Sequence, residues 1–440
     1  MQGRTRTGIL SCCLAVFLTG CPTAPSPVQR ALTFLSTTQT TAADEQRLGQ
    51  GKRMDYEGNW PQVFYFRHFQ PLRIPEVSPF VVAFVYHSLA QVNEDTADAL
   101  GLSQADVDDA RLMRKRAMEC LLRFESDPAA PDAGTFGFWP YDPDPAATNT
   151  PVQEAILDIF QGPILTGNRT PLNFDFFPHE LAIPADADVT ATTYAAMLDD
   201  FQLDGGPGAS VAFEQFFADW RDTGVVPRRL DPEWLPDATG AFFTWLMYKD
   251  PPDDTVPNDI DLVVNANVLH ALARYGKTST PGFDEAVALI NDAVQQGLHR
   301  DQWRDISDYY PQSYVFHYCV ARAYREGPVP GLAPAVDILA DDLEDEAIQR
   351  PDGTVFWDLG DPHLNTAFAL LTLLNAGRDT DLVEKGVEYL LREQDPARGC
   401  WDEGVFFVAH LYGGQEVHWA SSALTTAFVL EALCQYQLTQ

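Results

Sequence analysis

Two pairs of carboxylates, each with one residue between its members, stand at the start of apolar helical segments. Asp186 and Asp188 form the first pair, and Asp259 and Asp261 form the second. A carboxyl group in a dry cavity can hold a proton near neutral pH and deliver it to a substrate. These four residues are therefore candidate catalytic acids. The alternative is that they only cap helices, since Asp is among the best N-cap residues.

Aromatic, histidine and acidic side chains are expected around the same helix ends. Ring faces stabilise cations, but they serve equally as sugar platforms or as packing. Histidines and carboxylates could bind a metal, but catalytic zinc needs three convergent ligands and the spacing here does not supply them, so we expect no metal and no cofactor. The candidate binding residues are Trp245, Tyr309, Tyr310, Trp357, Asp361, His363, His418 and Trp419.

Asn265 and Asn267 interrupt an otherwise apolar segment. Buried amides must find hydrogen-bond partners. They are expected either to line a cavity or to bond neighbouring helices.

Helical segments of two kinds alternate along the chain. Segments polar on one face are expected to lie outside, and segments apolar nearly all round are expected to be buried. The outer segments are 26–39, 105–125, 208–223, 281–297, 332–349 and 380–394. The inner segments are 78–92, 189–203, 260–275, 310–325, 363–376 and 419–437. Six such pairs predict an all-α fold, a double ring of six inner and six outer helices, with no convincing β-strand pattern.

Connection lengths predict which end of this ring is elaborated. Connections from inner to outer helices are short, whereas the outer-to-inner connections are long: 40–77, 126–188, 224–258 and 395–418. Antiparallel helices place the two classes at opposite rims, and loops beyond about 15 residues are usually functional or disordered. The working face is therefore expected where the inner helices begin, with 126–188 as the candidate lid. The alternative is that these loops only stabilise the protein.

One segment carries a recognisable motif. It reads Lys385-x3-Tyr389-Leu390-x3-Gln394-x4-Gly399-x-Trp401, with partial copies at Arg30–Trp60 and Arg116–Trp139 and equivalent tryptophans at Trp303 and Trp357. The pattern resembles the QW motif of squalene and oxidosqualene cyclases. The resemblance covers most of 26–438 and implies the (α/α)6 toroid of the terpenoid cyclase and protein prenyltransferase superfamily. The motif is structural in that superfamily, so it indicates the fold more than the reaction.

Asp186-Ala187-Asp188-Val189-Thr190-Ala191 resembles the DxDDTA motif of class II cyclases. The resemblance implies that Asp188 is the general acid that protonates an alkene or epoxide. Val189 replaces the last Asp of the motif, which puts the support of that acid in doubt. The zinc site of protein prenyltransferases needs a D-x-C pair, and this chain has none.

The N-terminus looks like a targeting signal. Arg4 and Arg6 precede the apolar run 9–18, which is too short to span a bilayer as a helix. Leu18-Thr19-Gly20-Cys21 resembles the lipobox of bacterial lipoproteins, which implies lipidation at Cys21. We expect a signal peptide at 1–20, a tether at 21–28 and a single toroid domain at 29–440. The mature protein would be anchored in the cell envelope, on the extracytoplasmic side of a membrane.

The composition narrows the partners. The 440 residues contain 29 Lys and Arg against 63 Asp and Glu, for a formal net charge of −34. Nucleic-acid affinity depends on basic contacts to phosphate, so nucleic acid is excluded as a partner. The oligomeric state is left open.

Three functions compete on this scaffold. The first is a terpenoid cyclase-like or prenyltransferase-like protein that binds, and acts by acid catalysis on, a hydrophobic isoprenoid. The second is a non-catalytic binding or scaffold protein of the cell envelope, favoured by the missing third Asp. The third is a carbohydrate-active enzyme with two carboxylates about 5–10 Å apart across a groove, drawn from Asp259 or Asp261 and Asp358 or Asp361.

Overall fold

The computed structural model of the chain describes residues 24–47, 56–67, 73–126, 128–129, 132–138, 185–246, 257–378, 380–411 and 415–440. The expected signal peptide, Cys21, Trp139 and most of the expected lid at 126–188 lie outside these ranges. Within them, every helix is too short or too polar to cross a membrane.

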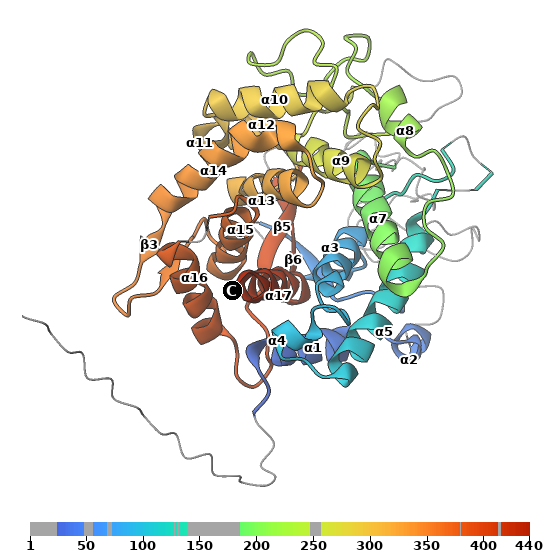
Figure 1. Cartoon of the computed structure of the whole chain (residues 1–440). Coiled ribbons are helices and arrows are strands. Elements are labelled where there is room, and N and C mark those ends of the chain that lie inside the picture. Colours follow the sequence, from blue (N-terminus) through green and yellow to red (C-terminus); the bar gives the residue numbers. More distant parts are fainter. Residues whose placement is uncertain are drawn as a thin grey trace, which may run out of the picture.

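Six helices form a closed ring at the centre of the protein (Figure 1). Each packs against the next along the chain, and the last packs back against the first. They are α3 (Pro79–Ala90), α7 (Ala187–Asp199), α9 (Leu262–Arg274), α13 (Ser313–Arg325), α15 (Pro362–Asn375) and α17 (Ser422–Thr439). Nearly every side chain of these helices is buried, as expected for the segments that are apolar all round.

A second set of helices lies outside this ring (Figure 1). The outer helices are α1 (Pro27–Thr38), α5 (Gln104–Leu121), α8 (Glu214–Asp219), α10 (Phe283–Gln295), α14 (Ala333–Glu346) and α16 (Asp381–Glu393). They are amphipathic: in α16, Val383, Val387 and Leu390 are buried and the charged residues face outward. The chain therefore divides its helices into two layers, as the alternation of patterns predicts.

Two helix predictions need correction. The outer helix expected at 208–223 is only the six-residue α8, because the Gly- and Pro-containing stretch before it does not continue a helix. The inner helix expected at 419–437 begins at Ser422, since residues 415–421 belong to a strand. The described residues also contain the short helices α2 (Ala42–Arg47), α4 (Ala97–Leu100), α11 (Leu298–Asp301) and α12 (Trp303–Ile306), the 3-10 turns η1 (Leu122–Phe124) and η3 (Pro330–Leu332), and the π-helical turn η2 (Asp200–Asp204).

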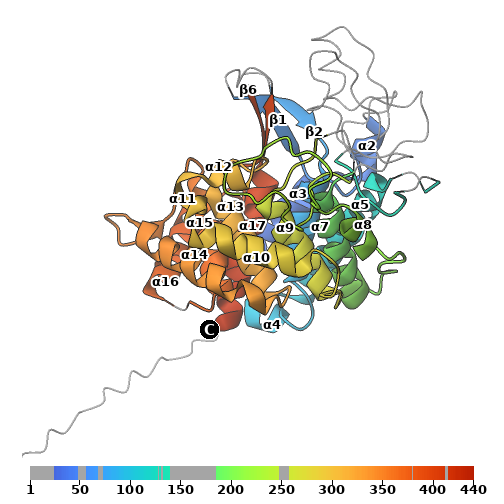
Figure 2. The same ribbon diagram turned by 90° about the horizontal axis from the view of Figure 1, so that it is seen from above.

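The prediction of no strands is wrong. An antiparallel sheet in the order β2-β1-β6-β5 lies at the end of the ring where the inner helices begin (Figure 2). Its strands are β1 (Gln62–Phe66), β2 (Ile74–Glu76), β5 (Gly404–Leu411) and β6 (Gln415–Ser421), and a separate hairpin joins β3 (Ile348–Gln349) to β4 (Val355–Phe356). A β-bulge lies between Val405 and Phe407. The bulge breaks the alternation of buried and exposed residues, so no period of two is visible in β5.

Tryptophan side chains close the ends of three outer helices. The indole N–H groups of Trp60, Trp357 and Trp401 donate to the carbonyls of Leu35, Leu343 and Leu390, at 2.8, 2.7 and 2.8 Å. Carbonyls in the last turn of a helix have no partner within the helix, so a buried indole donor satisfies them. These tryptophans therefore tie each turn to the helix before it.

Glutamines make the matching contacts between neighbouring helices. The Gln394 amide donates to the carbonyls of Gly399 and Pro27, both at 2.9 Å, and the Gln39 amide donates to Met113 at 2.9 Å and Gly58 at 3.2 Å. Pro27 begins α1, so Gln394 joins the last outer helix to the first. These contacts are of the kind expected from the residue pattern.

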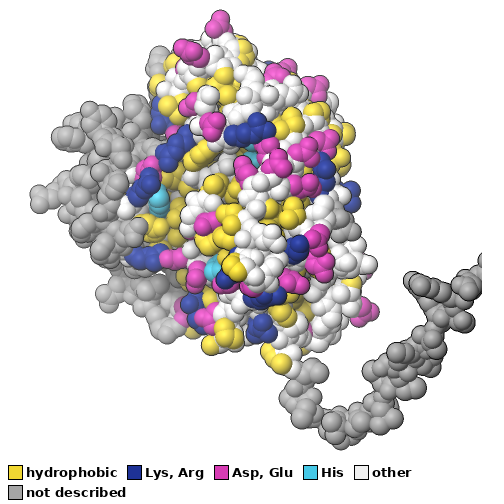
Figure 3. Space-filling model, turned by 90° about the vertical axis from the view of Figure 1, so that its left-hand side faces the viewer, with side chains coloured by type: hydrophobic (Ala, Val, Ile, Leu, Met, Phe, Trp, Pro, Cys, Tyr) yellow, Lys and Arg dark blue, Asp and Glu magenta, His cyan; other side chains and the backbone are white. Residues whose placement is uncertain are grey.

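Charged side chains of both signs are interspersed over the outer surface, as Figure 3 shows for one face. Arg378, in the connection between α15 and α16, pairs with Asp341 of α14 at 2.7 Å, and Lys385 pairs with Asp381 one turn away in α16 at 2.5 Å. Exposed pairs of this kind contribute little to stability, about 0–1 kcal/mol each.

Candidate functional site

Asp188 lies in the first turn of α7 and points into the core of the ring. Its side chain is buried, and both carboxyl oxygens have partners on neighbouring inner elements. Tyr310, just ahead of α13, donates its hydroxyl to Oδ2, and Asn267 of α9 donates its amide to Oδ1 at 2.7 Å. Three neighbouring segments of the inner ring therefore hold this one carboxyl group.

The protonation of Asp188 is balanced between opposing effects. Burial raises its pKa, while the hydrogen bonds from Tyr310 and Asn267 and the charge of Arg322 lower it, and the result is a pKa of about 6. Arg322 also donates to the other side of Asn267, at 2.6 Å. The group can thus hold a proton close to neutral pH and release it to an acceptor within the protein.

Asp186 and Asp261 act as helix caps. Asp186 accepts the Val189 N–H at 2.6 Å, and Asp261 accepts the N–H groups of Val263 and Val264 at 2.8 and 3.2 Å. The capping alternative therefore describes these two residues, but Asp188 makes no cap contact. Burial raises the pKa of both: that of Asp186 rises well above its ordinary value and that of Asp261 to about 7.

The other oxygen of Asp261 organises the loop that carries the two tyrosines. It accepts the Ser307 hydroxyl at 2.8 Å and the Asp308 N–H at 3.0 Å. Because this loop leads directly to Tyr310, Asp261 helps to place the hydroxyl that reaches Asp188. Asp261 is thereby a positioning residue, since both of its oxygens are occupied by donors.

Asp259 belongs to a second polar group beside the first. It accepts from the Arg229 guanidinium at 3.1 Å, from the Trp245 indole at 3.2 Å and from the Tyr309 hydroxyl. The Trp245 indole also lies 3.0 Å from the Tyr309 hydroxyl. The carboxylate is neutralised by an ion pair and carries three donors, so this arrangement suits ligand positioning better than proton transfer.

An aromatic wall joins these groups to the sheet. Tyr309 stacks on Phe407 with ring centroids 6.1 Å apart, and Tyr310 meets Phe406 edge-on at 5.4 Å. Phe407 in turn contacts Trp419 of β6 at 5.3 Å. Two phenylalanines of β5 therefore pack against Tyr309 and Tyr310. Aromatic rings can stabilise a positive charge.

Four other predicted binding residues lie apart from Asp188. Trp357 is fully buried and bonded to Leu343 of α14, so it packs between the helix layers. His363 sits near Tyr389, with its ring nitrogens 4.0 Å from Glu393 and Asp402. Asp361 accepts the Val405 N–H at 3.1 Å, and His418 contacts Glu416 at 3.0 Å.

The carbohydrate alternative uses two of the same regions. Asp358 accepts the N–H of Gly360 at 2.7 Å, and Asp361 is bonded to the backbone of β5. Asp259 and Asp261 both carry several donors. Each carboxyl group of the proposed acid pairs therefore accepts hydrogen bonds from within the protein. Their pairing across a groove stays a prediction.

Two residues that complete the site were not among the predicted site residues. The sequence marks Asn267 only as a buried amide, expected either to line a cavity or to bond neighbouring helices. It hydrogen-bonds both Asp188 of α7 and Arg322 of α13, which is the second of these two expectations. Arg322 is buried in α13 with its guanidinium over the Phe84 and Tyr318 rings, at 4.9 and 5.4 Å. An arginine in the middle of a run of apolar residues is the signal in the sequence that could identify it.

Comparison with known proteins identifies the fold. No family model and no curated protein matches the chain. Solved structures of the type II terpene cyclase MstE from Scytonema do match. The apo form is 15% identical, with a TM-score of 0.52 over 94% of this chain and 98% of that one. The chain has a terpenoid cyclase-like fold.

Two ligand complexes of variants of the same cyclase match over similar lengths. One holds its substrate, geranylgeranyl dihydroxybenzoate, at 14% identity and a TM-score of 0.51, and the other holds its product, merosterolic acid A, at 16% and 0.50. Each covers 94% of this chain and 97% of the other. At this identity the likeness establishes the fold, and the roles of individual residues stay predictions.

Proposed function

We propose that this protein is an (α/α)6 toroid that binds a hydrophobic isoprenoid and cyclises it by protonation, as a class II terpene cyclase does. The observation that carries the proposal is Asp188: a buried carboxyl with a pKa of about 6, held by Tyr310 and Asn267. Structures of the type II terpene cyclase MstE, which has the same fold, hold geranylgeranyl dihydroxybenzoate as substrate and merosterolic acid A as product.

In the proposed reaction, neutral Asp188 transfers its proton to a terminal alkene carbon. A new C–H bond forms, the π electron pair is used, and a tertiary cation remains on the neighbouring carbon. Internal alkenes of the substrate then attack this cation in turn, and loss of a proton ends the sequence. Phe406 and Phe407 pack on Tyr310, the residue that donates to Asp188. Aromatic rings beside the acid would stabilise the moving positive charge.

Tyr310 and Asn267 take over the support that the missing third Asp of the motif would supply. Their hydrogen bonds stabilise the carboxylate left after proton transfer, and the buried charge of Arg322 acts in the same direction. Val189 at the motif position is therefore compatible with an acid at Asp188.

The direct test is Asp188→Asn in an assay of linear geranylgeranyl compounds, with products analysed by mass spectrometry. The substitution keeps the size and one hydrogen-bonding oxygen but removes the proton that is transferred. We expect cyclisation to fall by at least about 100-fold, the usual scale of general acid catalysis. Asp342→Asn, on an outer helix and paired with His299 and Arg300, is the matched control and should retain activity.

An Asp188→Asn protein with unchanged activity would refute the proposed acid. A folded wild-type protein that binds a geranylgeranyl compound without converting it would instead favour the non-catalytic alternative. Thermal unfolding of both variants shows whether loss of activity reflects loss of the fold.

We further propose that Cys21 is lipidated and tethers the protein to a bacterial membrane on its extracytoplasmic side, where isoprenoids partition. The proposal rests on the residue pattern at 18–21. Expression of the full chain in a bacterium should give a membrane-bound form whose N-terminal peptide carries acyl mass. Cys21→Ser should move the protein to the soluble fraction, and recovery of both forms in the soluble fraction would contradict the proposal.

A further inference from the structure

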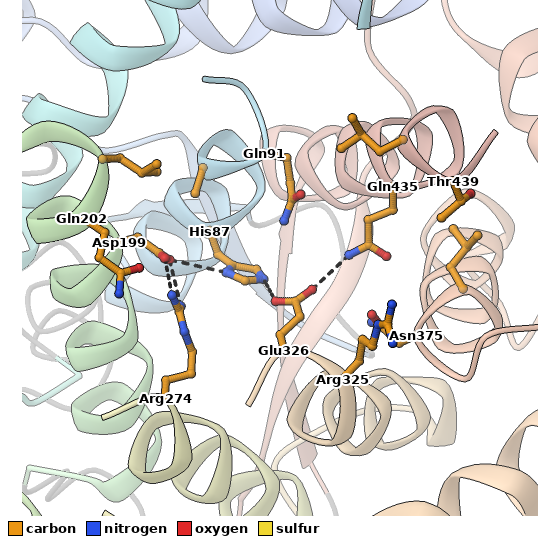
Figure 4. A pocket seen from close by; sticks show the side chains of 14 residues that line it. His87, Gln91, Asp199, Gln202, Arg274, Arg325, Glu326, Asn375, Gln435 and Thr439 are labelled. Carbon is orange, nitrogen blue, oxygen red and sulfur yellow. Dashed lines mark hydrogen bonds and ion pairs between the residues drawn. The ribbon is translucent and has the colours of Figure 1, made fainter. Parts of the chain in front are cut away.

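A cavity lies at the opposite end of the inner ring from Asp188. Its volume is about 410 Å³, and it is lined by the last turns of all six inner helices. Figure 4 shows His87, Asp199, Arg274, Glu326 and Gln435 converging on its floor. The proposed acid chemistry at the other end uses none of these side chains.

Three potential metal ligands meet beside this cavity. The Nε2 atom of His87 lies 3.1 Å from Glu326 Oε2 and 3.8 Å from Glu431 Oε1. One ligand atom from each residue falls within 4.8 Å of the other two. His87 and Glu431 are buried, and the Glu326 side chain is 20% exposed, so the group is dry but can be reached from the cavity.

A second, independent observation is His270. It is 1% exposed, and within the described residues neither of its ring nitrogens has a hydrogen-bond partner. Its Nε2 lies 4.0 Å from Glu326 Oε2, and its ring meets that of His87 edge-on at 5.9 Å. Buried polar groups are rarely left unsatisfied, so the unpaired imidazole of His270 beside the Glu326 carboxylate points to a ligand.

The groups behind these residues are arranged as in metal sites. The other ring nitrogen of His87, Nδ1, faces Asp199 at 3.8 Å, and Asp199 is fixed by Arg274 at 2.5 Å. Glu326 accepts from the Gln435 amide at 3.0 Å. A carboxylate behind the ligating histidine and hydrogen bonds to the ligating carboxylates orient such side chains toward a metal.

The geometry points to a binding site for one divalent transition-metal ion of the zinc class, held by His87, Glu326 and Glu431. Atoms bound at about 2.0–2.2 Å to a tetrahedral zinc lie roughly 3.4 Å apart. The two separations from His87 Nε2, 3.1 and 3.8 Å, bracket that value, and the two carboxylate atoms lie within 4.8 Å of each other. His270, whose Nε2 lies 4.0 Å from Glu326 Oε2, is the candidate for the fourth position. Mixed imidazole and carboxylate ligands suit zinc and its neighbours rather than calcium or magnesium.

Without a metal, a proton on His87 supplies the positive charge that offsets the Glu326 and Glu431 carboxylates. Burial disfavours protonation of His87, but the charges of Glu326 and Glu431 outweigh it and raise the His87 pKa to about 9. A purely structural ion cluster would need that proton and would gain nothing from zinc. The two explanations therefore differ in whether the protein takes up metal.

The test is equilibrium dialysis of the full chain, with any purification tag removed, against micromolar zinc, followed by metal analysis. We expect about one zinc ion per chain and, with cobalt in place of zinc, the visible absorption of tetrahedral Co²⁺. His87→Gln and Glu326→Gln should each weaken binding by tenfold or more. Glu326→Gln is the variant least at risk of unfolding, because its side chain reaches the cavity surface.

His299→Gln is the matched control. His299 is also buried and bonds a single carboxylate, Asp342, at 2.7 Å, so its loss should leave zinc binding unchanged. Asp188→Asn should also bind zinc normally, which separates this site from the proposed acid. A folded wild-type protein that takes up no zinc, or a Glu326→Gln variant that binds it as well as wild type, would overturn the assignment.

Discussion

At the scale of single residues, the two DxD pairs look alike in the sequence but differ in structure. Asp186 and Asp261 accept backbone N–H groups at helix starts, whereas Asp188 faces across the ring to Tyr310 and Asn267. In a helix, residues two apart point in different directions, so only one member of the first pair can cap while the other enters the core. The role of each carboxyl therefore follows from its direction.

Tyr310→Phe should alter how Asp188 ionises. The hydroxyl favours the carboxylate, so its removal raises the Asp188 pKa above about 6. Because the acid acts in its protonated form, the pH at which cyclisation declines should move upward, while the maximal rate falls by about tenfold as the conjugate base loses support. The pH–rate profile measures both effects.

Tyr314→Phe provides the control for that substitution. Tyr314 lies in the first turn of α13, just after Tyr310, and donates to Glu346 of the outer helix α14 at 2.8 Å. Its pH–rate profile should match that of the wild type, and an equal shift in both variants would show that the effect is not specific to Asp188.

At the scale of elements, the turns between the two helix layers are fixed by close contact. Gly399 has a φ of +78°, and a Cβ there would lie 2.5 Å from the Arg30 carbonyl oxygen of α1. The glycine of the motif is thus required both by its backbone conformation and by the approach of the neighbouring helix. The same holds at Gly58, where a Cβ would lie 2.0 Å from the Arg116 carbonyl oxygen.

Gly399→Ala should lower the free energy of unfolding by roughly 3 kcal/mol, since strain and a backbone clash add. Gly353→Ala isolates the strain: its φ is +89°, but nothing lies within 4 Å of the added Cβ. That variant should lose only about 1 kcal/mol. Chemical denaturation of both proteins measures the difference, and equal losses would show that the contact with α1 is unimportant.

At the scale of the whole molecule, the two ends of the ring hold different chemistry. Inner-helix N-termini, the sheet and the aromatic wall surround Asp188, while the C-termini surround the cavity beside His87. Both ends bury ionisable groups, so the stability of the protein depends on pH through many residues at once. Buried carboxyls with raised pKa and buried neutral histidines such as His317, whose pKa falls to about 3, contribute with opposite signs between pH 5 and 8.

Comparing wild type with Asp261→Asn isolates the contribution of one carboxyl group to the pH dependence of stability. Burial, less its hydrogen bonds, raises the Asp261 pKa from 3.8 to about 7, so the folded protein binds a proton that the unfolded chain releases. The stabilisation by this proton is present at low pH and is lost as pH rises through 7. The unfolding free energy of wild type relative to the variant should therefore fall by about 2.5 kcal/mol between pH 5 and pH 8. A constant difference across urea titrations at both values would contradict the raised pKa.

The alternation of helix types can be predicted from the sequence. A helix buried on one face repeats apolar residues every three or four positions, whereas a helix buried all round is apolar at nearly every position. The turn residues Gln394, Gly399 and Trp401 were readable for a similar reason, since their partners follow from one short motif. The sheet does not show in the sequence pattern for two reasons. A bulge interrupts β5, and the successive residues Val405 and Phe406 are both buried, so apolar and polar residues do not alternate there.

What the sequence alone determined about this protein is the order and type of its helices and the carboxyl groups at their starts. Only the tertiary structure decided that Asp188 meets Tyr310, which is 122 residues away, and that His87 meets Glu431 across the joint between α3 and α17. Contacts between residues so distant arise from closure of the ring. No local pattern records them, because each helix only has to be apolar to enter the core.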